Sequence, residues 1–162
     1  MSMKSLCIGS FEPYESAKSS LIGFERDDIL LGAMRVCFHR VNLAPFSGVT
    51  RTTTFVLRSK EADFLSFALL LLNLDSTINY ANSHSKGTTM PYAVWEGSLE
   101  NMPIIIPEYS ILRNFHKLVY PIISKIRDGI FLERNLLAVR EILLPKLISG
   151  KIRVPLEEEH VN

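Results

Sequence analysis

The residues best suited to chemistry are hydrogen-bond donors gathered in one short polar loop. Ser85 and Lys86 are followed by Gly87, Thr88 and Thr89. Lysine, serine and threonine side chains donate hydrogen bonds to phosphate oxygens and base edges, and glycine lets the backbone approach a ligand closely. Further candidates are arginines at strand ends and in loops: Arg35, Arg40, Arg51 and Arg58. Such a loop could contact a polar ligand, and the alternative is a structural turn among ordinary surface charges.

A second pair with chemical potential is Cys37 and His39. Residues two apart in a strand share a face, so a thiol–imidazole nucleophile stays open on geometry. However, no acid that would orient the histidine follows at a useful spacing, and the simpler interpretation is a buried thiol beside a strand histidine. The sequence also contains no P-loop, Rossmann glycine signature, HExxH, paired metal spacing or Asn/Asp-Pro-Pro-Tyr/Phe methyltransferase signature. We therefore expect no catalysis, no metal and no cofactor.

Composition limits the class of protein. Of the 162 residues, 47% are apolar, which suffices for a packed core, and the formal net charge of +1 is low for a nucleic-acid binder. The only cysteines, Cys7 and Cys37, have no CxxC spacing, which fits a reducing cytoplasm. Residues 1–9 do not resemble a signal peptide, and the apolar run 64–74 is about half of the roughly 20 residues that a bilayer requires. We expect no membrane association.

The first part of the chain predicts short strands followed by short helices. Residues 21–24 and 29–34 form a hairpin-like pair of strands around the polar turn 25–28, and 36–43 alternates as a half-buried strand should. A turn at 46–49 precedes a β-branched strand at 52–56. Helical spacing then covers 60–74 and a second helix covers 76–81, before a polar loop at 83–91. Residues 102–107 form an apolar strand that proline closes.

The last part of the chain has the periodicity of one long amphipathic helix. It runs for about 40 residues and would span about 60 Å, roughly twice the diameter of a small domain. Pro121 is expected to kink the helix or to start a second segment, and Gly150 is expected to cap it. One domain cannot cover such a stripe, so it requires a partner. The apolar positions assigned to helix pairing are Phe115, Val119, Ile122, Ile126, Ile130, Leu137 and Leu144.

Four motifs in order resemble the DNA-specificity subunits of type I restriction–modification systems. Residues 28–35 (Asp-Ile-Leu-Leu-Gly-Ala-Met-Arg) resemble the family's Gly-Asp-Ile-Leu hairpin. Residues 86–91 and 99–107 are similar to its G-S/T-T and L-P-I-P-x-P stretches. The most specific match is 140–152 (Arg-Glu-Ile-Leu-Leu-Pro-Lys-Leu-Ile-Ser-Gly-Lys-Ile), which resembles R-D-x-L-L-P-x-L-I-S-G-x-I. The resemblance extends from about residue 21 to residue 154.

The resemblance implies an α+β fold in which a small mixed-sheet target-recognition domain is followed by a long helix for antiparallel coiled-coil pairing. It divides the chain into a recognition domain at 1–107, shortened at its start, a spacer helix at 108–150 and a flexible tail at 151–162. Such subunits carry two recognition domains and two helices, so this chain resembles the C-terminal half. The implied partners are double-stranded DNA, methyltransferase subunits, a restriction subunit, and a second half-subunit or identical copy.

Under this resemblance the chain itself is non-catalytic, and S-adenosylmethionine is expected only in the methyltransferase partner. The residues assigned to the DNA contact are Arg35, Arg51, Ser85, Lys86, Thr88 and Thr89. The alternative function is an interaction module or truncated regulator that assembles through its helix without reading DNA.

Overall fold

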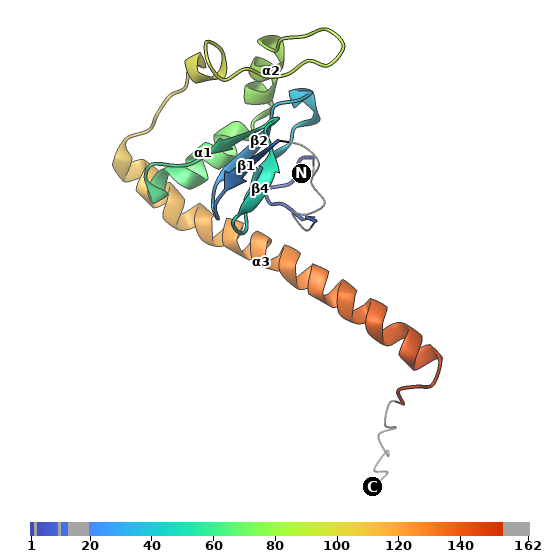
Figure 1. Cartoon of the computed structure of the whole chain (residues 1–162). Helices are drawn as coiled ribbons and strands as arrows, with labels where there is room; N and C mark the ends of the chain where they lie inside the picture. The colour runs from blue at the N-terminus through green and yellow to red at the C-terminus, as the bar shows by residue number, and fades with distance from the viewer. Residues whose placement is uncertain (2, 10, 13–19, 154–162) are drawn as a thin grey trace. The chain divides into compact units, whose positions relative to one another are not determined.

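The computed structural model describes residues 1, 3–9, 11–12 and 20–153. Short strands come first, short helices follow, and one long helix ends the described chain, which confirms the expected α+β class (Figure 1). The strands are β1 (Leu21–Phe24), β2 (Ile29–Gly32), β3 (Val41–Leu43), β4 (Gly48–Arg51) and β5 (Thr54–Leu57). The α-helices are α1 (Leu65–Leu72), α2 (Asp75–Ser83) and α3 (Tyr109–Ile148), and the 3-10 turns are η2 (Val36–Phe38), η3 (Ala62–Phe64) and η4 (Leu99–Asn101).

The core forms around a three-stranded antiparallel sheet in the order β3-β2-β5. All four residues of β2 are buried, which explains why this strand is apolar throughout instead of alternating. Leu30 lies opposite Asn42 on one side and Val56 on the other. Its side chain packs in a cluster with Ile8, Phe24 and Ala44. The sheet therefore gives the molecule a rigid centre from which the loops extend.

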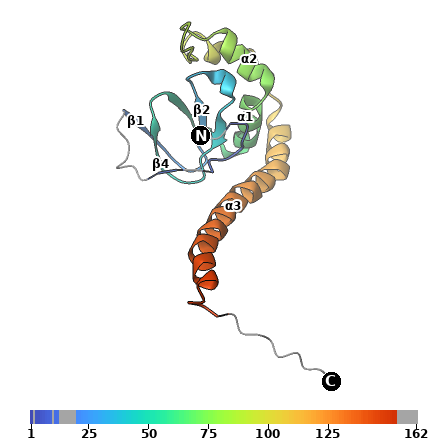
Figure 2. The same cartoon turned by 90° about the vertical axis from the view of Figure 1, so that its right-hand side faces the viewer.

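The predicted hairpin between residues 21–24 and 29–34 is wrong. β1 pairs antiparallel with β4 in a separate two-stranded sheet (Figure 2). The neighbours of β2 are β3 and β5. Phe24 explains part of this choice, because its ring lies over Gly48, where an added Cβ would stand 2.9 Å from the ring. Since both edges of β2 are occupied, the turn 25–28 leads from one sheet to the other.

Two other strand predictions need correction. Residues 36–43 do not form one strand: η2 comes first and β3 begins only at Val41. Arg35 and His39 have φ values of 46° and 50°, a left-handed conformation that a strand cannot contain. Of the predicted turn 46–49, Gly48 and Val49 belong to β4, and the run 52–56 splits into a turn and β5. The β-branched composition of these segments predicted that strands occur here, but it did not predict where each strand begins and ends.

Residues 102–107 form no regular element, contrary to the predicted strand. Pro103 and Pro107 lack backbone donors, and among the described strands none pairs with this segment. Ile105 is 91% exposed. The predicted helix 60–74 is divided into η3 and α1, whereas the helix predicted at 76–81 is confirmed as α2. Thr77 Oγ1 donates to the carbonyl of Leu71 at 2.7 Å and so connects α1 with α2.

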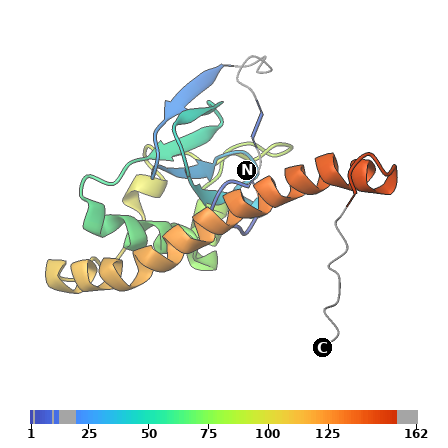
Figure 3. The same cartoon turned by 90° about the horizontal axis from the view of Figure 1, so that it is seen from below.

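The long helix α3 is continuous through Pro121, so no second segment starts there. Its beginning lies beside α1 (Figure 3), where Tyr109 donates to Asp63 at 2.9 Å and His116 Nδ1 lies 2.9 Å from Ser66 Oγ. Gly150 follows the helix with a φ of 70°, which confirms the predicted cap. Its amide donates to the carbonyl of Leu147.

The chain contains two compact units, Met1–Arg127 and Asp128–Asn162. α3 begins in the first unit and ends in the second. Within the first unit, Leu112, Ile123 and Arg127 are its buried residues. The recognition-domain and helix boundaries predicted after residues 107 and 150 remain predictions, and most of the predicted tail, from residue 154 on, lies outside the described residues.

Candidate nucleic-acid interface

The loop of residues 85–92 is attached to the segment that follows β2. Lys86 and Tyr92 exchange two backbone hydrogen bonds of 2.9 Å, which close the loop. The amide of Arg35 donates to the carbonyl of Pro91 at 2.7 Å, and Ala93 donates to Ala33 at 2.8 Å. Because these bonds are between backbone groups, the attachment of the loop does not depend on its side chains. These bonds attach the backbone of Arg35 directly to the base of the loop, and the recognition surface expected to include both remains a prediction.

The loop directs most of its polar side chains to solvent. Gly87 has a φ of 91°, and a Cβ there would stand 3.2 Å from the Met90 carbonyl, so the turn requires glycine. Lys86, Thr88 and Thr89 are exposed. Ser85 differs, because its hydroxyl donates to the carbonyl of Ala81 at 2.8 Å at the end of α2. Three of the four loop side chains assigned to DNA thus face solvent, while the fourth also caps a helix.

Arg51 lies at the end of β4, opposite Leu21 of β1. The turn that follows it brings the carbonyl of Thr53 within 2.9 Å of the Ala33 amide, at the end of β2. Arg51 is therefore close in the fold to the segment that carries Arg35, and its side chain is exposed. The structure brings together the C-terminal end of β2, the loop and the end of β4.

Arg58 lies apart from this surface. It follows β5, whose last residue pairs with the first residue of β2. Its Nε and Nη2 donate to the two carboxylate oxygens of buried Asp28 at 2.8 Å each, and its Nη1 lies 3.1 Å from Glu25. The hydrogen bonds from Arg58 lower the pKa of Asp28 below its ordinary value, and the amide of Glu25 adds to the effect. Asp28 and Glu25 raise the pKa of Arg58 in turn. Arg58 therefore has a structural role.

The turn η2 overturns the argument that placed Cys37 and His39 on one face of a strand. Cys37 is exposed, whereas His39 is buried with its Nδ1 at 3.3 Å from Asp75 Oδ1. The buried thiol expected at Cys37 is therefore wrong, and of the two cysteines it is Cys7 that is buried. A 3-10 turn between two left-handed residues changes the direction of each successive side chain, so the alternation of a strand does not apply.

Sequence reasoning missed Phe38 as a surface residue, because it assigned this side chain to the buried face of a strand. Phe38 is 41% exposed. The guanidinium carbons of Arg35 and Arg40 lie 5.9 and 5.5 Å from its ring centroid, within the range of cation–π interactions. Arg40 also donates through Nη2 to the Met34 carbonyl at 2.7 Å. The signal in the sequence was an aromatic residue with an arginine on either side.

The residues assigned to helix pairing differ in exposure. In the first unit, Phe115 and Val119 are half-buried, and Ile122 and Ile126 are exposed. The first unit covers a neighbouring face of α3 that contains Leu112. Among the residues of the second unit, Ile130 is half-buried, and Leu137 and Leu144 are exposed.

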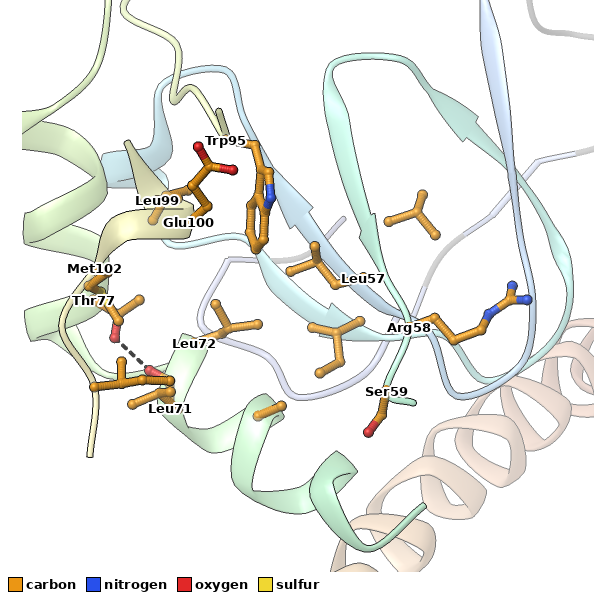
Figure 4. Close-up of a pocket in the computed structure, with 14 residues that line it drawn as sticks. Leu57, Arg58, Ser59, Leu71, Leu72, Thr77, Trp95, Leu99, Glu100 and Met102 are labelled. Carbon is orange, nitrogen blue, oxygen red and sulfur yellow. Dashed lines mark hydrogen bonds between the residues drawn. The ribbon is translucent and has the colours of Figure 1, made fainter. Parts of the chain in front are cut away.

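An apolar pocket of about 480 Å³ lies between β5, α1 and the segment 95–104 (Figure 4). Leu57, Leu72 and Trp95 are among the residues that line it. The hydroxyl of Thr77 and the guanidinium of Arg58 lie at its edge, and both already have partners within the fold. The pocket is therefore suited to an apolar group more than to a charged substrate.

Two further features bear on function. Among the described residues, no group of three or more histidine, cysteine, aspartate or glutamate side chains is placed to hold a metal ion. Within the same residues, no single helix is long and apolar enough to cross a membrane. The length and hydropathy of a membrane span are reached only by combining two helical segments, Ala62–Leu72 and Asp75–Ser83, which are bent by 69° relative to each other.

Similarity to known proteins bears on the function of this chain. No protein-family model matches the chain. Over 118 residues the chain is 36% identical to the type I restriction enzyme MjaIX specificity subunit of Methanocaldococcus jannaschii. The match supports the specificity-subunit family. It extends over 71% of this chain but only 26% of the relative, so the chain spans about a quarter of that protein.

The similarity supports the restriction–modification resemblance that the sequence motifs suggested, at the level of the specificity-subunit family.

Proposed function

We propose that this chain is a DNA-reading half-subunit of a type I restriction–modification complex and corresponds to the C-terminal half of a specificity subunit. The observation that carries the proposal is the attachment of the 85–92 loop to Arg35 through the bond to Pro91. This bond attaches Arg35 to the loop that carries the ammonium of Lys86 and the hydroxyls of Thr88 and Thr89. Such groups contact phosphates and base edges in the major groove.

The chemistry of the complex belongs to its partners in this proposal. Methyltransferase subunits bind S-adenosylmethionine and modify the DNA, and a restriction subunit cleaves it. This chain supplies recognition of one half of a split duplex site and needs no cofactor of its own. A cytoplasmic location accompanies this role.

The helix α3 would join this chain to a second copy or to another half-subunit. The support is the set of apolar side chains that remain in solvent along it, including Ile122 at 61% exposure. Burying such side chains against a second helix gains about 25 cal/mol per Å² of apolar surface. Antiparallel pairing of two such helices would separate two DNA half-sites by a set distance.

The test is selection of bound DNA by the assembled complex. The chain, co-expressed with a type I methyltransferase subunit, is expected to enrich one split sequence from a randomised duplex library. Binding to the selected duplex should weaken steeply with salt, because phosphate contacts release counterions. A complex that assembles but enriches no sequence would contradict the proposal.

The second candidate function is an interaction module that assembles without reading DNA. The net charge of +1 and the exposed apolar residues of α3 favour it. The same salt series separates the two functions, since apolar helix pairing hardly changes with salt. Assembly that survives high salt, together with duplex binding that is absent at every salt concentration, would identify the module.

A further inference from the structure

Phe38 is an exposed aromatic side chain on a rigid part of the proposed DNA surface. Val36 is 1% exposed and anchors the turn in the core, while the adjacent Cys37 and Phe38 face solvent. Within the turn, Phe38 donates its amide to the Arg35 carbonyl at 2.9 Å, and His39 donates to Val36 at 2.8 Å. These contacts hold the ring outside the core.

The elements around the turn fix it further. Lys4 donates to the carbonyl of His39 at 2.9 Å, and α2 approaches the turn through Asp75, whose carboxylate lies 3.3 Å from His39. Arg35 is bonded to the loop through Pro91. Three separate parts of the chain thus converge on this turn. Folding Phe38 inward would break those contacts, so its exposure is built into the fold.

The surroundings of the ring indicate which ligand it suits. Two guanidinium carbons lie within 6 Å of the ring centroid, at 5.9 Å for Arg35 and 5.5 Å for Arg40. An apolar protein partner would be a poor match, because covering the ring would also bury two cations. A nucleotide offers the complement, since it combines a flat or methylated apolar base with an adjacent phosphate anion. Aromatic side chains contribute to nucleic-acid binding by such contact with bases.

We propose that Phe38 is a base-contacting residue, whose ring packs against a nucleobase of the bound duplex while Arg35 and Arg40 face its phosphates. This inference rests on the proposed function. It adds a specificity-determining residue that neither the motifs nor the polar-donor pattern assigned. It also gives Arg40 a role, because this side chain is connected by its Nη2 to the Met34 carbonyl and stays beside the ring.

The experiment compares variants of the full chain in complex with its methyltransferase partner. The probes are the duplex selected from the randomised library and a shuffled duplex of the same composition. Phe38→Ala should weaken binding to the selected duplex by about 5- to 150-fold, the usual effect of removing an aromatic–base contact. The slope of log affinity against log salt should stay unchanged, because no charge is removed. Phe38→Trp should retain most of the affinity.

The matched control is Ile104→Ala. Ile104 is 43% exposed, close to the exposure of Phe38, and lies in the segment 102–107, outside the turn, the loop and the end of β4. It should leave affinity unchanged. Phe38→Leu keeps apolar volume and removes the ring, so it should fall between Phe38→Ala and the unmodified chain. An unreactive Cys7, which is 0% exposed, will show that each variant remains folded.

Cys37 offers an independent measurement, because it is exposed beside Phe38. Its alkylation should slow when the selected duplex is added to the complex. Protection by the methyltransferase subunit alone, before DNA is added, would overturn the proposal and identify the turn as a protein contact. If Phe38→Ala binds the selected duplex with unchanged affinity, only the role of Phe38 fails. If the unmodified complex binds no duplex, the proposed function fails as well.

Discussion

Nη1 of Arg127 lies 3.0 Å from Oδ1 of Asp27, a contact that joins α3 to the turn between β1 and β2. The side chain of Arg127 is 5% exposed and that of Asp27 is 30% exposed. Tyr120 Oη also donates to Asp27, at 3.3 Å. Asp27 has a φ of 68°, a conformation that aspartate and asparagine tolerate better than most residues. The turn thus holds its carboxylate toward the first part of α3.

We predict that Asp27→Asn destabilises the protein more than Arg127→Met. Asparagine keeps the backbone preference and an acceptor, but it removes the charge that accompanies a buried guanidinium, which typically costs about 3–5 kcal/mol. Methionine removes the cation and keeps apolar volume, and the Asp27 carboxylate that remains is 30% exposed and can be hydrated, so we expect a smaller loss. Urea unfolding of both variants measures the two costs. Equal losses would show that the charge pair does not determine stability here.

The ion pair between Asp28 and Arg58 should make the stability fall in acid. The guanidinium lowers the pKa of Asp28 below its ordinary value of 3.8, so the carboxylate favours the folded state. That contribution is complete above the ordinary value and is lost as the pH falls through the lower folded value. The free energy of unfolding should therefore decrease below about pH 4.

Asp28→Asn should flatten this part of the profile and cost about 1–3 kcal/mol at neutral pH. Urea titrations at several pH values measure both effects. Glu25→Gln is a control, because Glu25 also lies beside Arg58 but is exposed. An acid profile that is the same in Asp28→Asn and the unmodified protein would contradict the assignment.

Charges placed in the pairing stripe of α3 should dissociate the assembly. Ile126→Asp and Leu137→Asp put carboxylates where we expect apolar contact with a second helix, and burying an unpaired charge is costly. Sedimentation velocity at micromolar concentration should show a smaller species for each variant. Lys117→Asp, an exposed change on another face of α3, should leave the assembly intact. A monomer before any substitution would rule out this pairing.

The loop residues should differ in their effects according to the group that each one contacts. Lys86→Ala should weaken all duplexes alike and reduce the salt slope by about one unit, as expected for one phosphate contact. Arg35→Ala or Thr88→Ala should cost about 1–3 kcal/mol on the selected duplex and little on others, as expected for a base edge. Lys60→Ala removes an equivalent charge outside this surface and is the control. Unchanged affinity in all three loop variants would make the loop structural.

The isolated chain should neither methylate nor cleave DNA. The sequence contains no methyltransferase signature, and the geometry separates Cys37 from His39. Incubation with S-adenosylmethionine and duplex DNA should transfer no methyl group, whereas the complex with the methyltransferase subunit should do so. Methyl transfer by the chain alone would refute this prediction.

The sequence by itself determined the features that depend on local periodicity. The apolar repeat of α3 predicted a long helix, and the structure has it from Tyr109 to Ile148. Gly150 predicted the cap, because glycine adopts positive φ without a Cβ clash. The general order of strands followed by helices also came from local composition. The resemblance of residues 140–152 to a conserved motif depended on the same short range.

Only the tertiary structure decided which elements are neighbours. β1 pairs with β4 and not with β2, because Phe24 packs over Gly48 and both edges of β2 are occupied. The turn at 36–39 depends on left-handed residues that neighbouring segments hold in place. That turn exposes Phe38. The pairing of β5 with β2 places Arg58 at the opposite end of β2 from Arg35, which the sequence had grouped with it. Strand pairing and positive φ at non-glycine residues depend on contacts distant in sequence, which local patterns do not contain.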